Sequence, residues 1–310
     1  MKKRKHFWAL MLTAALLLSL TACGKKEAGS ETAENTNMEA DAEKKENPEE
    51  PEPEKIDPLA AARKNIAAAA SMDARLAADM AMEISINGEK QSVESTAVID
   101  MSCFYEPAPM RMKMDLTLNM GEAGSITRNI YTEADADGAV TMYLYDGFGW
   151  QSKSVDTEAA GQYDAGSKMA VCLSPQNSFE EAGIEQIDNV NAYKYKGVIT
   201  GDNRKKILSS SGALDALGYI GIDFSQMETV PDDLGEIPFE LWIDEESLYP
   251  VQYEADITKA ADALTAGMAK SIEEWPEGMS MNISEVKIKM TCFHYNEATE
   301  FSIPDEAKNR

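Results

Sequence analysis

The stretch MRMKMDLTLNM, residues 110–120, constrains the fold more than any other, because apolar and polar side chains alternate along its whole length. Successive side chains of a β-strand point to opposite faces, so this period of two predicts a strand with one apolar and one solvated face. A sheet built from such strands needs a cover over its apolar side. The residues of the apolar face are Met110, Met112, Met114, Leu116, Leu118 and Met120.

Segments with the same period lie on both sides of this strand. They are residues 80–86, 93–101, 125–132, 140–145 and a short segment from Trp150. Pairs typical of tight turns separate them: Asn87-Gly88, Asp137-Gly138 and Asp146-Gly147. Six consecutive strands without an intervening helix predict an antiparallel meander.

Helices to cover the sheet are predicted at both ends of this meander. Asp57-Pro58 is a helix start, with a capping acid before a proline, and the helix should run to about Met72. Residues 257–275 repeat apolar residues at spacings of three and four, which is typical of an amphipathic helix. Residues 156–172 and 203–217 form weaker helical patterns, and further strands are predicted at 192–200, 237–244, 249–257 and 283–295.

The predicted fold is therefore α+β: a strongly curved antiparallel sheet with helices covering its concave face. We expect one domain over residues 59–310, since about 250 residues fall within the range of a single large domain.

The N-terminus predicts export and a lipid anchor. Four basic residues precede sixteen mostly apolar ones, from Phe7 to Ala22, which is shorter than the roughly 20 residues of a comfortable membrane span. Leu20-Thr21-Ala22-Cys23 resembles the lipobox of bacterial lipoproteins, which implies a signal peptide over residues 1–22 and a lipidated Cys23. Two or more acyl chains hold a protein firmly at a membrane. An ordinary secretory signal with an incidental cysteine is the alternative.

Residues 23–58 are predicted to be a disordered tether that begins at the lipidated cysteine. Residues 24–58 contain twelve acidic and five basic side chains and almost nothing apolar, so they cannot bury enough surface to fold. Most of the formal net charge of −25 belongs to the domain that follows. A charge of that sign argues against nucleic acid as a partner, and against electrostatic attachment to anionic lipid.

Three segments carry a resemblance to a known family. They are FELWIDEESLYPVQYEADIT at residues 239–258, Tyr295-Asn296, and FSIPDEA at 301–307. This arrangement resembles the LolA/LolB and LppX–LprG superfamily of envelope lipoproteins, and more closely an uncharacterised LolA-like lipoprotein family of Gram-positive bacteria. The resemblance implies a half-barrel whose helical lid encloses a cavity for acyl chains or lipidated partners. It supplies no ligand-binding motif that can be matched residue by residue.

The candidate cavity lining follows from the apolar strand faces and the 257–275 helix. It comprises Met80, Met82, Met110, Met112, Met114, Leu116, Leu118, Met142, Leu264, Met268 and Ile272. Methionine is flexible and polarizable, and suits a surface that adapts to several apolar ligands. Plain core filling beneath the helices is the competing explanation.

The chain offers little for catalysis. After signal removal His294 is the one histidine left, and with Cys292 it is expected to share a strand face, as a thiolate–imidazole pair would require. No nucleophile motif surrounds the pair, and no residues have zinc-ligand spacing. The sequence EADADG, residues 133–138, is better explained as an acidic hairpin turn than as a calcium loop. We expect no enzyme activity, no metal and no cofactor.

Two further groups leave alternatives open. Cys103, Cys172 and Cys292 could form one disulfide of undetermined pairing, although small buried side chains are the commoner role of such cysteines. The aromatic residues Tyr143, Tyr145, Phe148 and Trp150 could line a cavity mouth, but rim packing of a hairpin is the simpler description.

The sequence thus predicts a lipoprotein anchored at the extracytoplasmic face of the cell membrane, which binds or carries a lipid-like ligand between sheet and helices. The alternative is an envelope sensor or interaction module with a filled core and a protein partner. A third hypothesis, an envelope hydrolase using Cys292 and His294, is the weakest.

Overall fold

The fold was described from a computed structural model. It describes residues 56–106, 110–135, 137, 139–155, 164–201, 203–205, 234–271 and 279–309. In this part of the chain no helix combines the length and the apolar character needed to cross a bilayer.

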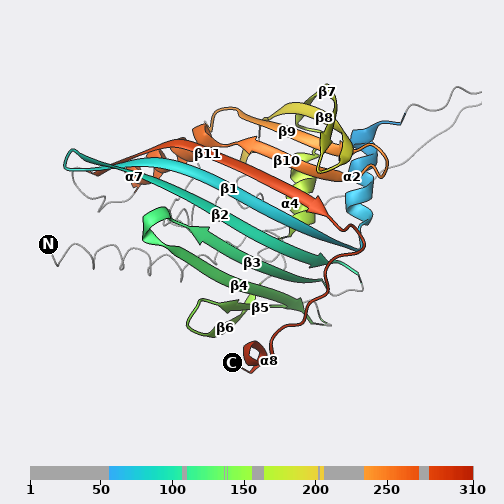
Figure 1. Ribbon diagram of the computed structural model, residues 1–310, viewed down its shortest axis with the longest axis horizontal. Helices are drawn as coiled ribbons and strands as arrows, with labels where there is room; N and C mark the ends of the chain where they lie inside the picture. Colours follow the sequence, from blue (N-terminus) through green and yellow to red (C-terminus); the bar gives the residue numbers. More distant parts are fainter. Residues whose placement is uncertain are drawn as a thin grey trace, which may run out of the picture.

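The eleven strands within these residues form one sheet, in the order β6-β5-β4-β3-β2-β1-β11-β10-β9-β8-β7, with β6 and β7 as its two edges (Figure 1). Every pairing is antiparallel. The strands are β1 (Ser71–Ile86), β2 (Glu89–Phe104), β3 (Arg111–Asn119), β4 (Ser125–Ala134), β5 (Val140–Tyr145), β6 (Trp150–Val155), β7 (Ser178–Ile187), β8 (Val190–Ile199), β9 (Ile237–Asp244), β10 (Pro250–Asp256) and β11 (Met279–Phe293).

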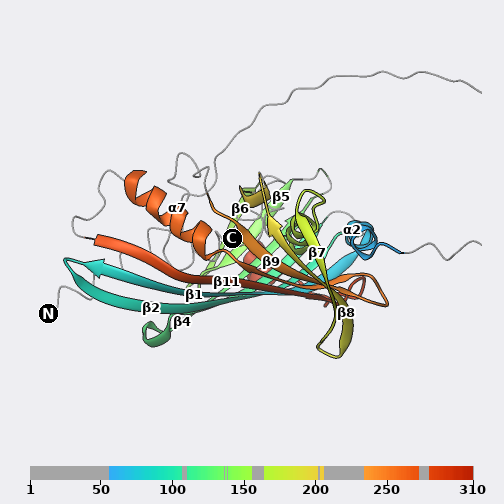
Figure 2. The ribbon, with the colours of Figure 1, turned by 90° about the horizontal axis from the view of Figure 1, so that it is seen from above.

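The sheet is curved and unclosed, and helices lie on its inner side. Figure 2 shows α2 (Pro58–Ala68) and α7 (Thr258–Ser271) on that side. Helix α4 (Ala165–Cys172) packs on the same inner core, whereas the short α8 (Asp305–Lys308) lies near β5 and β6 (Figure 1). The predicted fold class, a strongly curved antiparallel sheet with helices over its concave face, is confirmed.

The six-strand meander is also confirmed, but its first strand is longer than predicted. Helix α2 ends at Ala68 rather than near Met72, because Ala69 adopts an extended conformation, with φ −65° and ψ 129°. Strand β1 then begins at Ser71, nine residues before the predicted start. The buried residues of its first half include alanines. Because alanine is only weakly hydrophobic, the alternation of apolar and polar residues is hard to see in this part of the sequence.

Strand β7 was missed by sequence analysis. Eight of its ten residues are exposed, so it shows almost no apolar alternation. It is an edge strand whose register against β8 shifts between Glu181 and Ile184, where Gly183 has a positive φ of 93°. Bulges of this kind are common at sheet edges, where they discourage pairing with other chains.

The weaker helix predictions are only partly within the described residues. Helix α4 covers the second half of the predicted 156–172 helix, and residues 156–163 lie outside the described part. The same holds for residues 206–217 of the predicted 203–217 helix and for 272–275 at the end of the 257–275 helix.

One continuous core occupies the inner side of the sheet. It combines residues from β1–β6 and β8–β11 with Ala62 and Ile66 of α2, Met169 of α4 and Leu264 of α7. The packing is close: a Cβ on Gly197 of β8 would lie 2.2 Å from the Ser178 carbonyl oxygen and 2.6 Å from the Phe239 ring. Only glycine therefore fits at this point of the sheet.

Candidate ligand-binding surface

The inward side chains of β1 to β5 form an apolar surface that we call the methionine face. Cross-strand neighbours include Cys103 and Met112, Met101 and Met114, and Thr132 and Met142. Its members are Met80, Met82, Met101, Met112, Met114, Leu116, Leu118 and Met142. Because these strands are antiparallel neighbours, their inward positions meet in one continuous patch.

The methionine face is covered. The exposed fractions of its side chains lie between 0 and 6%. Leu264 of α7 belongs to the same core, with 1% exposure. Met110 lies just before β3 and is only partly buried against that core. The side chain of Met268 and the whole of Ile272 lie outside the described residues.

Helix α7 is held over β11 by polar contacts near its start. Thr258 Oγ1 accepts a hydrogen bond of 2.9 Å from Val286 N, and Asp262 Oδ1 accepts one of 3.3 Å from Ile283 N. Beneath these contacts the helix presents Ala260 and Ala261, both fully buried. Such small side chains let the helix approach the sheet closely.

Helix α4 begins at a capping aspartate that is itself buried. Asp164 accepts hydrogen bonds from Ser167 N at 2.8 Å, from Gly166 N at 3.1 Å, and from the hydroxyl of Tyr105. Its far end supplies Met169 and Cys172 to the core, both fully buried. The cap thus fixes how α4 enters the inner side of the sheet.

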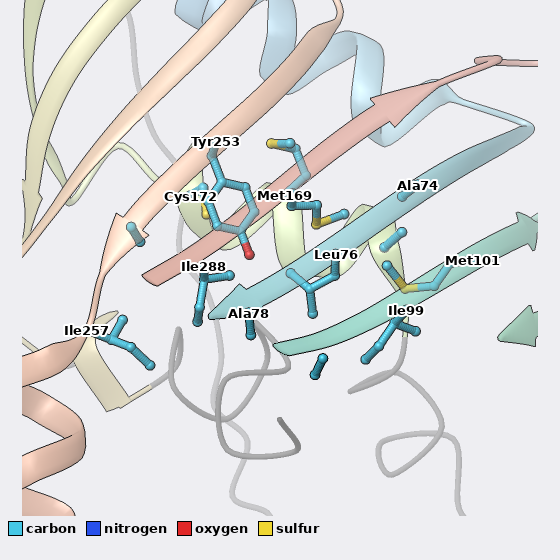
Figure 3. Close-up of a cluster of buried hydrophobic side chains, with 14 of the residues drawn as sticks. Ala74, Leu76, Ala78, Ile99, Met101, Met169, Cys172, Tyr253, Ile257 and Ile288 are labelled. Atoms are coloured by element: carbon cyan, nitrogen blue, oxygen red, sulfur yellow. The ribbon is translucent and has the colours of Figure 1, made fainter. Parts of the chain in front are cut away.

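Among the residues that the structure describes, two fully buried hydroxyls on the inner side have no hydrogen-bond partner. They belong to Tyr253 of β10 and Thr132 of β4, each with 0% exposure. Figure 3 shows the Tyr253 hydroxyl pointing into the apolar cluster, toward Ile288 and the Leu76–Ala78 stretch of β1. Sequence analysis did not select these residues, although the alternation of Tyr253 with Glu254 in β10 marks the tyrosine as inward-facing.

The cysteines within the described residues, Cys103, Cys172 and Cys292, are free thiols, and all are buried. Burial raises the pKa of Cys103 and of Cys292 to about 12, and it raises the pKa of Cys172 as well. A thiol in such a setting is not a nucleophile at neutral pH. The small buried role expected for these residues is what the structure describes.

The expectation that Cys292 and His294 share a strand face is wrong. Strand β11 ends at Phe293, and His294 has a positive φ of 52°, which turns its side chain out of the strand's alternation. Cys292 stays in the core, whereas the side chain of His294 is 57% exposed. His294 Nδ1 instead lies 2.9 Å from Asp73 Oδ2.

That contact is part of a clasp that joins the turn after β11 to the start of β1. Asp73 also accepts hydrogen bonds from Thr299 Oγ1 at 2.7 Å and Thr299 N at 3.1 Å. Asn296 Oδ1 accepts one of 2.7 Å from Ala70 N, and Tyr295 donates one of 2.6 Å to the Pro250 carbonyl. The clasp is structural, since each group satisfies another group of the same chain.

Two motifs noted in the sequence belong to hairpins. Asp135 Oδ1 accepts hydrogen bonds of 2.9 Å from both Asp137 N and Ala139 N, which is an acidic turn. Tyr145 and Trp150 pack against each other across the β5–β6 hairpin, with ring centroids 5.3 Å apart, and Phe148 at its tip is 97% exposed. Among the described residues no three His, Cys, Asp or Glu side chains are grouped so as to hold a metal ion.

A depression of about 430 Å³ lies on the outer face of the sheet, opposite the methionine face. Its lining comes from β1 and β8 to β11, and its charged side chains are Asp79, Lys196, Lys287, Lys289, Glu240, Glu254 and Asp256. Several pair across strands, such as Lys289 with Glu254 at 3.4 Å. The charges are mixed, so the depression favours no one class of ligand.

Comparison with known proteins gives likenesses in structure alone. No protein-family model and no curated protein matches the sequence. The chain is similar to the solved structure of LprF from Mycobacterium bovis, at 13% identity and a TM-score of 0.43, over 81% of this chain and 95% of that one. It is similar to the Mycobacterium tuberculosis lipoprotein LppX at 14% identity and a TM-score of 0.39, over 79% and 98%.

A LolA superfamily protein from Nitrosomonas europaea is similar at 10% identity and a TM-score of 0.19, over 80% of this chain and 94% of that one. At such low identities these likenesses concern the fold alone.

Proposed function

We propose that this protein is an extracytoplasmic lipoprotein that binds a lipid-like ligand between the methionine face and the helices over it. One observation carries the proposal: the inner side of an unclosed eleven-stranded sheet is largely apolar and rich in methionine. Methionine side chains change rotamer at little cost, so this surface can repack around apolar guests of different shape.

The methionine face is buried in the described structure, so the segments that cover it would have to move away before a ligand could bind. Each methylene of a guest acyl chain that leaves water contributes about 0.8 kcal/mol. Burying even half of a long chain would therefore offset the displacement of several methionine side chains.

We further propose that Cys23 carries the lipid anchor, with residues 1–22 as the signal peptide, 23–58 as the tether and 59–310 as the binding domain. The support is the lipobox-like Leu20-Thr21-Ala22-Cys23 and the acidic, apolar-poor segment after it. Membrane attachment then resides in the lipid and not in the acidic domain.

The proposal is tested by identifying the lipids that are bound to the mature protein. The full chain is expressed in a host that processes lipoproteins, extracted in mild detergent, and its non-covalent lipids are identified by mass spectrometry. We expect a stoichiometric acyl lipid in addition to the anchor. A Cys23→Ser variant should lose the anchor and leave the membrane fraction while retaining the bound lipid. Absence of lipid from both preparations would refute the carrier proposal.

The alternative function is an envelope sensor or interaction module with a filled core. The near-complete burial of the methionine face favours it. Crosslinking in intact cells separates the two: a single stoichiometric protein partner without bound lipid supports the sensor.

We propose no catalytic role. A Cys292–His294 hydrolase is disfavoured because the thiol is buried and the imidazole is turned away from it. If an envelope hydrolase activity were found, it should survive His294→Ala.

A further inference from the structure

The two unpaired hydroxyls of the inner side are unusual for a core. Buried polar groups in proteins are nearly always hydrogen-bonded, because an unpaired one keeps the full cost of leaving water. Phenylalanine in place of Tyr253 and valine in place of Thr132 would fill nearly the same volume without that cost. The sequence nevertheless retains an oxygen at each position, with 0% exposure.

The surroundings of Tyr253 are apolar and include several small or flexible side chains. Leu76 and Ala78 of β1 lie near the ring's polar end, and Met169 and Cys172 of α4 lie beside the ring (Figure 3). All of these neighbours are uncharged. A guest that displaced Met169 would bring its own atoms against the hydroxyl.

Thr132 repeats this arrangement on the other flank of the methionine face. In the ladder it lies between Met112 of β3 and Met142 of β5, both of them buried. Strands β3, β2, β1 and β11 separate the threonine from Tyr253 of β10. The two oxygens therefore mark opposite sides of one apolar surface.

We propose that the hydroxyls of Tyr253 and Thr132 donate hydrogen bonds to the ligand, and that the ligand is a neutral esterified acyl lipid. This inference rests on the proposed function and specifies its substrate class. An ester carbonyl offers an acceptor without a charge. A carboxylate placed beside the uncharged neighbours of Tyr253 would lose its hydration without gaining a counter-charge. A pure hydrocarbon would leave both hydroxyls unpaired.

The experiment measures binding of two probes to the full Cys23→Ser chain and to its Tyr253→Phe and Thr132→Val derivatives. One probe is a pyrene-labelled long-chain dicarboxylic acid as its dimethyl ester, so that each of its two carbonyls can meet one hydroxyl, and the other is a pyrene-labelled alkane of equal length. Loss of one buried hydrogen bond should weaken ester binding about tenfold in each variant and leave alkane binding unchanged. The ligand-free variants should melt at the same temperature as the parent or higher, because each loses an unpaired polar group.

Tyr295→Phe is the matched control. Its hydroxyl already donates a 2.6 Å hydrogen bond to the Pro250 carbonyl, so the variant should melt lower without a change in the ester-to-alkane ratio. Equal ester affinity in parent and Tyr253→Phe would overturn this inference and leave the proposed function standing. A lower melting temperature for ligand-free Tyr253→Phe would also overturn it, because the hydroxyl would then be satisfied without a ligand. Binding of neither probe by the parent would overturn the proposed function itself.

Discussion

At the scale of single residues, Asp73 is a buried carboxylate that joins the start of β1 to the chain after β11. It is nearly fully buried at the start of β1, where it receives two hydrogen bonds from Thr299 and a contact from His294. Burial acts to raise the pKa of Asp73, but the hydrogen bonds from His294, Ser102 and Thr299 outweigh it, so the net pKa is lowered. The carboxylate is therefore stabilised in the folded state.

A lowered pKa makes the stability depend on pH. The contribution of Asp73 should be complete above about pH 4, the ordinary pKa of an unfolded aspartate, and should be lost as the pH falls through the folded value. Asp73→Asn should lower the free energy of unfolding by about 1.5–3 kcal/mol at pH 7 and flatten the loss of stability in acid. Urea unfolding at pH 7, 5, 4 and 3 measures both effects. An exposed change, Glu246→Gln, serves as the control, and parallel pH curves for Asp73→Asn and the parent would contradict the prediction.

At the scale of elements, helices α2 and α4 start with the same capping residue in different surroundings. Asp57 is exposed, and its Oδ1 accepts from Leu59 N at 3.0 Å and Ala60 N at 3.2 Å. Asp164 is buried, and it caps α4 while also accepting from Tyr105. The two caps can therefore be compared directly, because both are aspartates but only Asp164 is buried and also accepts a hydrogen bond from another side chain of the core.

Asp57→Ala should cost about 1 kcal/mol of stability, which is typical of a lost helix cap. Asp164→Ala should cost about 2–4 kcal/mol, because it removes a cap and also leaves the hydroxyl of Tyr105 without that acceptor. Denaturant unfolding of both variants gives the comparison. Equal losses would show that the Tyr105 contact adds nothing.

At the scale of the whole molecule, one core joins parts that are distant in the sequence. Cys103 from β2, Cys172 from α4 and Cys292 from β11 all lie in it. Since all three of these thiols are buried, none of them can react until the helices and the sheet separate. The thiols thus report on cooperative opening of the core.

In a Cys23→Ser chain at pH 8, the three thiols should resist a disulfide reagent in the native state and react together on unfolding. Burial raises the pKa of Cys103 and of Cys292 to about 12, so very little thiolate is present at that pH. Labelling followed by mass spectrometry identifies each site, and an added exposed cysteine, Ser154→Cys, should label within minutes. Rapid native labelling of Cys172 alone would show instead that α4 opens by itself.

Much of the fold was predictable because local alternation carries it. The period of two in MRMKMDLTLNM determined which side chains of β3 face inward, and Asn87-Gly88 and Asp57-Pro58 marked a turn and a helix start that the structure contains. The N-terminal pattern that predicts a lipid anchor likewise belongs to the sequence alone. These features depend on residues that are close together in the sequence, so a local pattern is enough to predict them.

The tertiary structure alone decided which distant groups meet. It placed β7 at the sheet edge, turned His294 toward Asp73 and away from Cys292, and left the hydroxyl of Tyr253 unpaired in the core. Strand order, register and the seating of α4 on the sheet determine these contacts. Each arises from packing between residues far apart in the chain, so no local pattern could have specified its partner.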